Sequence, residues 1–268
     1  MNRPIRLKAA SYEKVWGSLH LEPWFPNPSH KTGEVWFTSE PPLPILVKFL
    51  FTSEKLSVQV HPTGPAPRGK TEMWQILRAD PGAQIALGFR EPVTRERLRE
   101  AARSGEIENL LRWFPVQAGE TYFTPAPTVH AIGAGIALCE IQQNSDITYR
   151  LYDYGRPRDL HIEEAVAIAD LGTHPGASLA IESSPGRELL VRCPYFETEL
   201  LTIAPKSEGV RGEQLVFLEG RGAIAGMPFQ AGEVWRLHDS AEGWAVRSEG
   251  PFRALRVREP GDILGAKC

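Results

Sequence analysis

The chain is poor in cysteine. Its 268 residues contain three cysteines, Cys139, Cys193 and Cys268, and no two of them form a CxxC pair. An odd and scattered set of this size provides neither a disulfide framework nor a thiolate zinc site. The small, disulfide-stabilised secreted class is therefore excluded, and a metal ion would need ligands other than thiolates.

A basic surplus and long apolar runs are also missing. Lys and Arg number 30 against 33 Asp and Glu, which leaves a net charge of -3 and a pI near 6.2, so nucleic acid is not an expected partner. A few clustered cations can still bind a phosphorylated small molecule. No run approaches the roughly 18 apolar residues of a membrane span, and the opening sequence MNRPIRLKAASYEKVW lacks a signal-peptide core. We expect a soluble cytoplasmic protein with no membrane partner, either a monomer or a small homo-oligomer.

What the chain does contain is frequent punctuation by glycine (24) and proline (23). Between these residues lie stretches of roughly 5–9 residues, rich in β-branched and aromatic side chains, that are typical of strands. The clearest are PILVKFLF, KLSVQVH, TEMWQIL, QIALGF, ETYFTP, GIALCEIQQ and DITYRLYDY. The pattern predicts a mainly β protein built as barrels or sandwiches.

Two stretches have helical periodicity instead. TRERLREAARSG, continued through EIENLLRWF, predicts a small helical insertion at about residues 94–113. Residues 159–171 predict a second helix, because Ile162 and Ala165 begin an apolar face and Gly172 supplies a stop signal. We expect residues 1–171 to form an N-terminal catalytic barrel that carries both.

The second half of the chain resumes the strand pattern after a break. Residues 172–188, GTHPGASLAIESSPGRE, are rich in Gly, Pro and Ser and are predicted to be a linker to a second β unit at 189–268. QAGETYF, from residue 117, is echoed by QAGEVWR, from residue 230, as expected if the two units are duplicates. Only the first copy runs on to a histidine, in TVH, so chemistry is expected in the N-terminal unit.

The stretch LSVQVHPTGPAPRGKTEMW contains candidate metal ligands. Alternate side chains of a strand share a face, so Gln59 and His61 project together, and Lys70 and Glu72 share a face of the next strand. A tight turn between the two strands would place Glu72 opposite the Gln59 and His61 pair. GETYFTPAPTVH then brings His130 to the start of another strand.

These four residues form a plausible ligand set. Two imidazole nitrogens, a carboxylate and an amide oxygen suit Zn²⁺ first, and also Mn²⁺, Co²⁺ or Fe²⁺, with positions left open for water or substrate. Either histidine alone is more simply explained as a polar residue near a turn. The convergence of both with a same-face Gln and Glu favours a single divalent ion.

The same stretches resemble a known family. The spacing Gly-x5-Pro-x4-His at 119–130 is similar to the second cupin motif, and LSVQVHP, GKTEMW, TPAPTVHAIGAG and QQNSDITYRLYDYGRPRDLH together resemble class I mannose-6-phosphate isomerases of the short bacterial form. VWG and GEVW fit the N-terminal region of that family. The resemblance runs from about residue 4 to about residue 170, and it implies two cupin-like β-barrel or jelly-roll units with a short helical segment between them.

The resemblance also implies an activity and a set of site residues. The activity is the interconversion of D-mannose 6-phosphate and D-fructose 6-phosphate by proton transfer through a cis-enediol, with one divalent ion, Zn²⁺ being the first choice. The implied metal ligands are the four residues gathered above. The implied polar residues of the active site are Lys48, Lys70, Glu140, Asp146 and Arg150.

The residues themselves agree with several of these roles. Lys48 interrupts an apolar strand, Glu140 needs a partner if it is buried, and Asp146 shares strand parity with Arg150. A guanidinium at Arg150 suits a developing enediolate because it stays charged and offers a planar fork of donors. The base is open between Lys70, Asp146 and Glu140, and the phosphate could bind Lys48 or an Arg of the helical segment. Trp36 and Trp74 are interpreted as core residues.

Two departures from the family and two rival functions accompany this reading. The loop PTGPAPRG between His61 and Glu72 is short, and Pro127 stands where the family favours Gly, which affects the lid and substrate reach more than the ligands. One rival is a cupin that binds a sugar or sugar phosphate without turning it over. The other is an iron-dependent cupin dioxygenase, which the Gln ligand and the Lys and Arg residues make less favoured.

Overall fold

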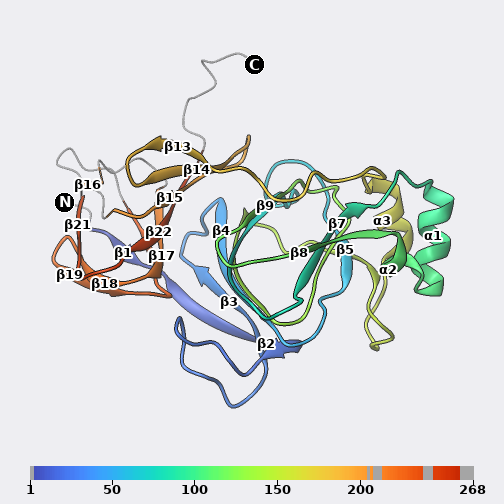
Figure 1. Ribbon diagram of the computed structural model, residues 1–268, viewed down its shortest axis with the longest axis horizontal. Coiled ribbons are helices and arrows are strands. Elements are labelled where there is room, and N and C mark those ends of the chain that lie inside the picture. Colours follow the sequence, from blue (N-terminus) through green and yellow to red (C-terminus); the bar gives the residue numbers. More distant parts are fainter. Residues whose placement is uncertain (1–2, 204–205, 208–212, 238–243, 260–268) are drawn as a thin grey trace.

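The computed structural model describes residues 3–203, 206–207, 213–237 and 244–259, and within them the chain forms strands almost throughout, with three short helices. The strands group into two β units that lie side by side (Figure 1), with the helices at the far end of the first unit. The predicted mainly β, cupin-like fold is confirmed. None of the helices in these residues has the length and apolarity needed to cross a membrane.

The first unit consists of two antiparallel sheets. The six-stranded sheet contains, in order, β2 (Lys8–Ser18), β3 (Thr32–Thr38), β4 (Ile45–Thr52), β11 (Ile136–Gln143), β6 (Glu72–Ala79) and β9 (Thr121–Thr124). The five-stranded sheet contains β12 (Tyr149–Tyr152), β5 (Val58–Val60), β10 (His130–Ile132), β7 (Gln84–Phe89) and β8 (Leu111–Pro115).

Side-chain alternation along β4 separates the interior of this barrel from its outer face. Phe49 and Phe51 point outward into a core shared with the second unit, whereas Leu50 points inward and packs with Trp74 and other apolar residues between the two sheets. All eight residues of β4 are buried, so Lys48, on the Leu50 face, carries its charge into the barrel interior.

The helices cover the outer face of the five-stranded sheet. α1 (Arg95–Ser104) begins at Thr94, whose hydroxyl accepts a hydrogen bond from the backbone N–H of Arg97, and it ends at Gly105 with φ of 82°. α2 (Ile107–Leu110) and α3 (Ile162–Ile168) follow. Helical structure of the insertion stops at Leu110, before the expected residue 113, because the next five residues pair with β7 as strand β8.

The second unit is also built from two sheets. The larger contains β1 (Ile5–Arg6), β20 (Val234–Arg236), β17 (Gln214–Glu219), β22 (Arg253–Arg258), β15 (Glu197–Leu201), β14 (Arg187–Arg192) and β13 (Ile181–Ser184). The smaller contains β16 (Lys206–Ser207), β21 (Trp244–Ser248), β18 (Arg221–Ile224) and β19 (Met227–Gln230). The extreme N-terminal strand thus pairs with the second unit, and β13 lies inside the stretch 172–188.

The sequence echo marks equivalent corners of the two units. Gly119 and Gly232 both have positive φ, 97° and 85°, and each stands shortly before a strand. Those strands, β9 and β20, pair antiparallel with β6 and β17 respectively. A glycine is required at both corners because other residues rarely adopt this backbone conformation.

Candidate metal centre and active site

Strand β5 places three polar side chains next to one another. Gln59, at its centre, lies opposite His130 on β10 and opposite Arg150 on β12. Its neighbours Val58 and Val60 are fully buried on the other face, against the helices. Strand alternation therefore turns Gln59 toward the barrel interior, as the sequence predicted.

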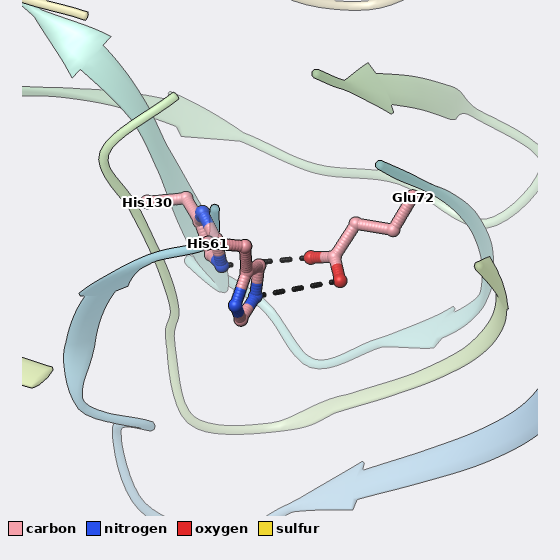
Figure 2. A group of neighbouring side chains, drawn as sticks. All are labelled: His61, Glu72 and His130. Carbon is pink, nitrogen blue, oxygen red and sulfur yellow. Dashed lines mark ion pairs between the residues drawn. The ribbon is translucent and has the colours of Figure 1, made fainter. Parts of the chain in front are cut away.

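Glu72 reaches the same point from the opposite sheet. The sequence predicted a tight turn that would make the strands of Gln59 and Glu72 neighbours. This prediction was wrong, because β5 and β6 belong to different sheets. The chain crosses between the sheets after His61 through a compact loop, in which a Cβ on Gly69 would lie 1.8 Å from the carbonyl oxygen of Gly64. Glu72 consequently faces the histidines across the barrel interior (Figure 2).

The three strongest candidate ligands converge closely. Nε2 of His61 lies 3.5 Å from Oε2 of Glu72, and Nε2 of His130 lies 3.5 Å from Oε1. The candidate ligand atoms all lie within 4.8 Å of one another. All three residues are at most 1 % exposed. The ring centroids of the two imidazoles are 4.9 Å apart, so both histidines face one site.

Hydrogen bonds to the backbone determine the form of both imidazoles. Nδ1 of His61 is 2.9 Å from the carbonyl oxygen of Ile147, and Nδ1 of His130 is 2.8 Å from that of Thr128. A carbonyl only accepts, so each Nδ1 donates and each Nε2 presents a lone pair to the interior. Burial lowers the pKa of His61 well below its ordinary value and that of His130 to about 4, so both rings are neutral at pH 7.

The donor set fits a divalent cation. Within the described chain neither buried oxygen of Glu72 accepts a well-aligned hydrogen bond, and only Oε2 has a lysine, Lys70, within ion-pair distance. The lone pairs of the two neutral imidazoles point toward the same carboxylate. Neutral imidazole nitrogens and a carboxylate are the ligands expected for Zn²⁺.

Gln59 can add an oxygen to this set. As placed, its amide nitrogen is 3.2 Å from Nε2 of His130, and its oxygen accepts a 3.2 Å hydrogen bond from the hydroxyl of Ser57. Rotating the amide by half a turn exchanges nitrogen and oxygen without moving other atoms. The hydroxyl of Ser57 can accept as well as donate, so it satisfies either orientation.

Lys70 is the nearest cationic group to these ligands. Its Nζ lies 2.9 Å from Nε2 of His61 and 3.1 Å from Oε2 of Glu72. Burial disfavours the ammonium, but the charges of Glu72 and Glu140 outweigh burial and raise the pKa of Lys70. Lys70 is therefore protonated and holds its charge against the carboxylate.

A cavity of about 350 Å³ opens beside this centre and is lined by six of the polar residues implied by the resemblance and the ligand argument: Lys48, Lys70, Glu72, Glu140, Asp146 and Arg150. Gln59 is a seventh predicted residue in this lining, whereas His61 and His130 are not among the lining residues. The volume is within the range of small-molecule sites, about 300–1,000 Å³. The sequence-predicted residues thus meet in one place.

Lys48 and Glu140 form a buried pair in the cavity wall. Nζ of Lys48 lies 3.4 Å from Oε2 of Glu140, and Nε1 of Trp74 donates to Oε1 at 3.1 Å. Nζ of Lys48 also lies 4.2 Å from the ring centroid of Trp36. Burial lowers the pKa of Lys48, and burial together with the charge of Glu72 raises that of Glu140.

Asp146 and Arg150 do not pair with each other. Nη1 of Arg150 donates to the carbonyl oxygen of Asp159 at 2.7 Å, and no hydrogen bond or ion pair joins the two side chains in the part of the chain that the structure describes. Asp146 is exposed and lies in an irregular segment before β12, outside any strand. Both side chains nevertheless line the cavity.

Several lining residues were missed from the sequence. Trp36, interpreted as core, forms part of the wall, and so do the following polar residues: Lys14, Glu34, Ser57 and Arg158. Glu34 and Trp36 stand two apart on β3, and alternation could have placed them on one face. Ser57 shares the Gln59 face by the same alternation, whereas Lys14 and Arg158 carried no signal stronger than an ordinary surface residue. His238 lies outside the described residues.

A larger depression of about 940 Å³ lies near the ends of β4 and β11, around Thr52 and Ile136. Its cationic side chains are already engaged. Arg78 donates to backbone carbonyls at 2.7 Å, and Lys55 lies 2.6 Å from a carboxylate oxygen of Glu108. It contains nothing comparable to the converging ligands of the smaller cavity.

Known proteins resemble this chain over most of its length. Mannose-6-phosphate isomerase of Streptococcus mutans is 34% identical over 246 residues, and the match covers 73% of this chain and 78% of the relative. Mannose-6-phosphate isomerase ManA of Bacillus subtilis is 32% identical over 245 residues, and the match covers 72% of this chain and 77% of that relative. The chain belongs to the mannose-6-phosphate isomerase family. No family model matches it.

Solved structures of the family share the architecture. The mannose 6-phosphate isomerase from Bacillus subtilis has a TM-score of 0.83 and 26% identity, and covers 96% of this chain and 100% of its own. A zinc-bound mannose 6-phosphate isomerase has a TM-score of 0.73 and 18% identity, and it covers 96% of this chain and 100% of its own. At this identity the likeness shows the fold alone. The two-unit β fold is thus the fold of this family.

Proposed function

We propose that this protein is a zinc-dependent aldose–ketose isomerase that interconverts D-mannose 6-phosphate and D-fructose 6-phosphate through a cis-enediol. The observation that carries the proposal is the convergence of two neutral imidazoles on a buried carboxylate, beside a cavity lined with lysine and arginine. The relatives named mannose-6-phosphate isomerase supply the substrate.

The residues that would hold the ion are Gln59, His61, Glu72 and His130. When bound, zinc supplies Lewis acidity that polarises oxygens of the sugar. The backbone carbonyls that accept from the two Nδ1 atoms keep the imidazoles oriented with Nε2 inward. The ligand geometry is therefore pre-organised by the fold.

Proton transfer between C1 and C2 needs one group that removes a proton and another that supplies one to oxygen. We assign the first role to Asp146. The other cavity carboxylates are engaged: Glu140 with Lys48 and Trp74, Glu34 with Lys14, and Glu72 with the ion. Asp146 has no hydrogen bond or ion pair within the described chain and is exposed to the cavity.

Two cations complete the mechanism. Lys70, whose pKa the charges of Glu72 and Glu140 raise in the metal-free site, is placed to donate a hydrogen bond or a proton to a sugar oxygen. Arg150 stands opposite Gln59 on the neighbouring strand, so its permanent charge lies close enough to stabilise an enediolate.

We also propose that the protein works in the cytoplasm as a monomer or small homo-oligomer. Cys139 and Cys193 are free, which accords with a reducing compartment. Size-exclusion chromatography with light scattering measures the oligomeric state directly.

A coupled assay tests the function. Fructose 6-phosphate formed from mannose 6-phosphate should be detected, should disappear on prolonged EDTA treatment, and should return when Zn²⁺ is added. A cupin that only binds the sugar phosphate would bind it without forming product. Absence of product from zinc-replete protein would refute the isomerase proposal.

A further inference from the structure

Two guanidinium groups stand together in the wall of the cavity. Arg150 lies on β12, and Arg158 lies on the segment that follows. The chain reverses after β12 at Tyr154 and Gly155, both with positive φ. It then returns along the strand, where the backbone N–H of His161 donates to the carbonyl oxygen of Arg150 at 2.7 Å. This return places Arg158 beside Arg150.

A buried carboxylate fixes the orientation of Arg158. Asp153, 2 % exposed, accepts hydrogen bonds from Nε and Nη2 of Arg158 at 2.5 and 2.8 Å, and it also accepts from Nη1 of Arg156 at 3.1 Å. Nη1 of Arg158 has no hydrogen-bond partner within the described chain. Arg156 also pairs with Glu54 at 3.2 Å, so Arg158 relies on Asp153 and, among the described residues, keeps Nη1 free.

Arg150 has unused donor capacity as well. Its Nε is buried and has no hydrogen-bond partner, which is unfavourable for a charged donor. Burial, and then the nearby charge of Arg158, lower the pKa of Arg150. Because Arg150 is assigned to the enediolate, the free Nη1 of Arg158 remains for a second anionic group of the substrate.

The other cations of the chain fit an anion less well. Lys48 already pairs with Glu140 and stacks over Trp36. Arg99 and Arg103 of the helical insertion pair with Glu163 and do not line the cavity, so we favour a different arginine.

We propose that Arg158 anchors the phosphate group of the substrate next to Arg150, which makes Arg158 the residue that selects phosphorylated over free sugars. A guanidinium suits this role because its planar fork matches two phosphate oxygens at once. The inference rests on the proposed function for the identity of the sugar, but it concerns the recognition of phosphate alone.

The test measures binding of unreactive polyols to the zinc-loaded protein by isothermal titration calorimetry. Mannitol 6-phosphate and mannitol are compared on wild type, Arg158→Gln, Arg158→Lys and the control Arg156→Gln. Arg156 shares Asp153 but does not line the cavity. Charge-assisted hydrogen bonds to phosphate predict that R158Q weakens mannitol 6-phosphate binding by roughly 10- to 100-fold and leaves mannitol binding unchanged.

The control and the lysine variant separate an anchor from a structural role. R156Q should bind mannitol 6-phosphate within about threefold of wild type, and R158K, which keeps the charge but loses the fork, should lie between wild type and R158Q. In the isomerase assay, R158Q should raise KM for mannose 6-phosphate far more than it lowers kcat.

Each outcome decides. An unchanged Kd in R158Q, an equal loss for mannitol, or the same loss in R156Q would overturn the anchor. If R158Q does not fold by circular dichroism, R158K decides alone, and a Kd equal to wild type overturns the proposal. A wild type that binds mannitol 6-phosphate through Arg158 but forms no fructose 6-phosphate would refute the isomerase and leave the anchor standing.

Discussion

Breaking the buried pair of Lys48 and Glu140 should cost the protein a large part of its stability. The two residues are paired across β4 and β11 and are each 3 % exposed, with Nζ and Oε2 3.4 Å apart. Lys48→Met removes the charge, keeps a side chain of similar length, and leaves Glu140 with the hydrogen bond from Trp74. Removing one partner of a buried ion pair typically costs about 3–5 kcal/mol, and we expect that loss for the metal-free protein at pH 8.

The loss should shrink in acid. Burial, reinforced by the charge of Glu72, already raises the pKa of Glu140, and removing Lys48 raises it further. A carboxyl with a raised pKa in the folded state takes up a proton more readily folded than unfolded. Its destabilising effect is therefore absent below the unfolded pKa and grows with pH up to the folded pKa, by about 1.4 kcal/mol per pH unit. The deficit of K48M should be clearly smaller at pH 5 than at pH 8.

Urea unfolding of the metal-free variants at both pH values measures these differences. Glu140→Gln alone should also destabilise, because it leaves Lys48 buried without its carboxylate. The double variant K48M/E140Q has no buried charge at this position and should lie within about 1 kcal/mol of wild type, since apolar replacement of a buried pair is often neutral. Additive losses, with the double variant less stable than either single variant, would refute the reasoning.

Three further predictions concern the metal centre and the base. Metal analysis of protein prepared with zinc should give one zinc ion per chain, and His61→Ala and His130→Ala should each abolish zinc binding. A wild-type protein prepared with excess zinc that contains almost none would contradict the site. In the metal-free protein, burial lowers the pKa of His130 to about 4. The free energy of unfolding should therefore fall by about 3 kcal/mol as the pH is lowered from about 6.5 to about 4, because the unfolded chain binds the proton first. Urea unfolding of His130→Gln should lack this part of the pH dependence. Asp146→Asn should lower kcat by roughly 10²–10⁴-fold while zinc content and mannitol 6-phosphate binding stay at wild-type values, and a kcat within threefold of wild type would exclude Asp146 as the base.

Much of the site could be predicted from the sequence because strand alternation is a local rule. The period of two along LSVQVH turned Gln59 inward and its valine neighbours outward, and the structure has the same arrangement. Alternation also puts Lys48 on the inner, Leu50 face of β4, although from the sequence it was seen only to interrupt an apolar strand. Asp146 stands in an irregular segment outside the strand, yet it lines the same cavity as Arg150, with which it shares parity.

The partner of a strand is not a local property. The sequence indicated that the strands of Gln59 and Glu72 follow closely, and a short Pro- and Gly-rich loop suggested a hairpin. The loop instead crosses from one sheet to the other. β6 pairs with β11 and β9 along most of its length, whereas β5 has only three residues available for pairing. Arg158 was missed for a similar reason, because only the return of the chain along β12 brings it to the cavity.

Buried carboxylates of the second unit, among its described residues, are paired with arginine. Glu199 on β15 and Arg256 on β22 share the faces of Leu201 and Ala254, which pack between the two sheets of that unit. Arg256 lies 2.8 Å from Glu213 and 3.7 Å from Glu199, so arginine neutralises these buried carboxylates from within the chain. In the first unit the only cation within ion-pair distance of Glu72, among the described residues, is Lys70, while two imidazole lone pairs face the carboxylate. Two imidazole nitrogens and a carboxylate that face one point form a ligand set for a divalent cation, and for this reason we place the metal ion in the first unit.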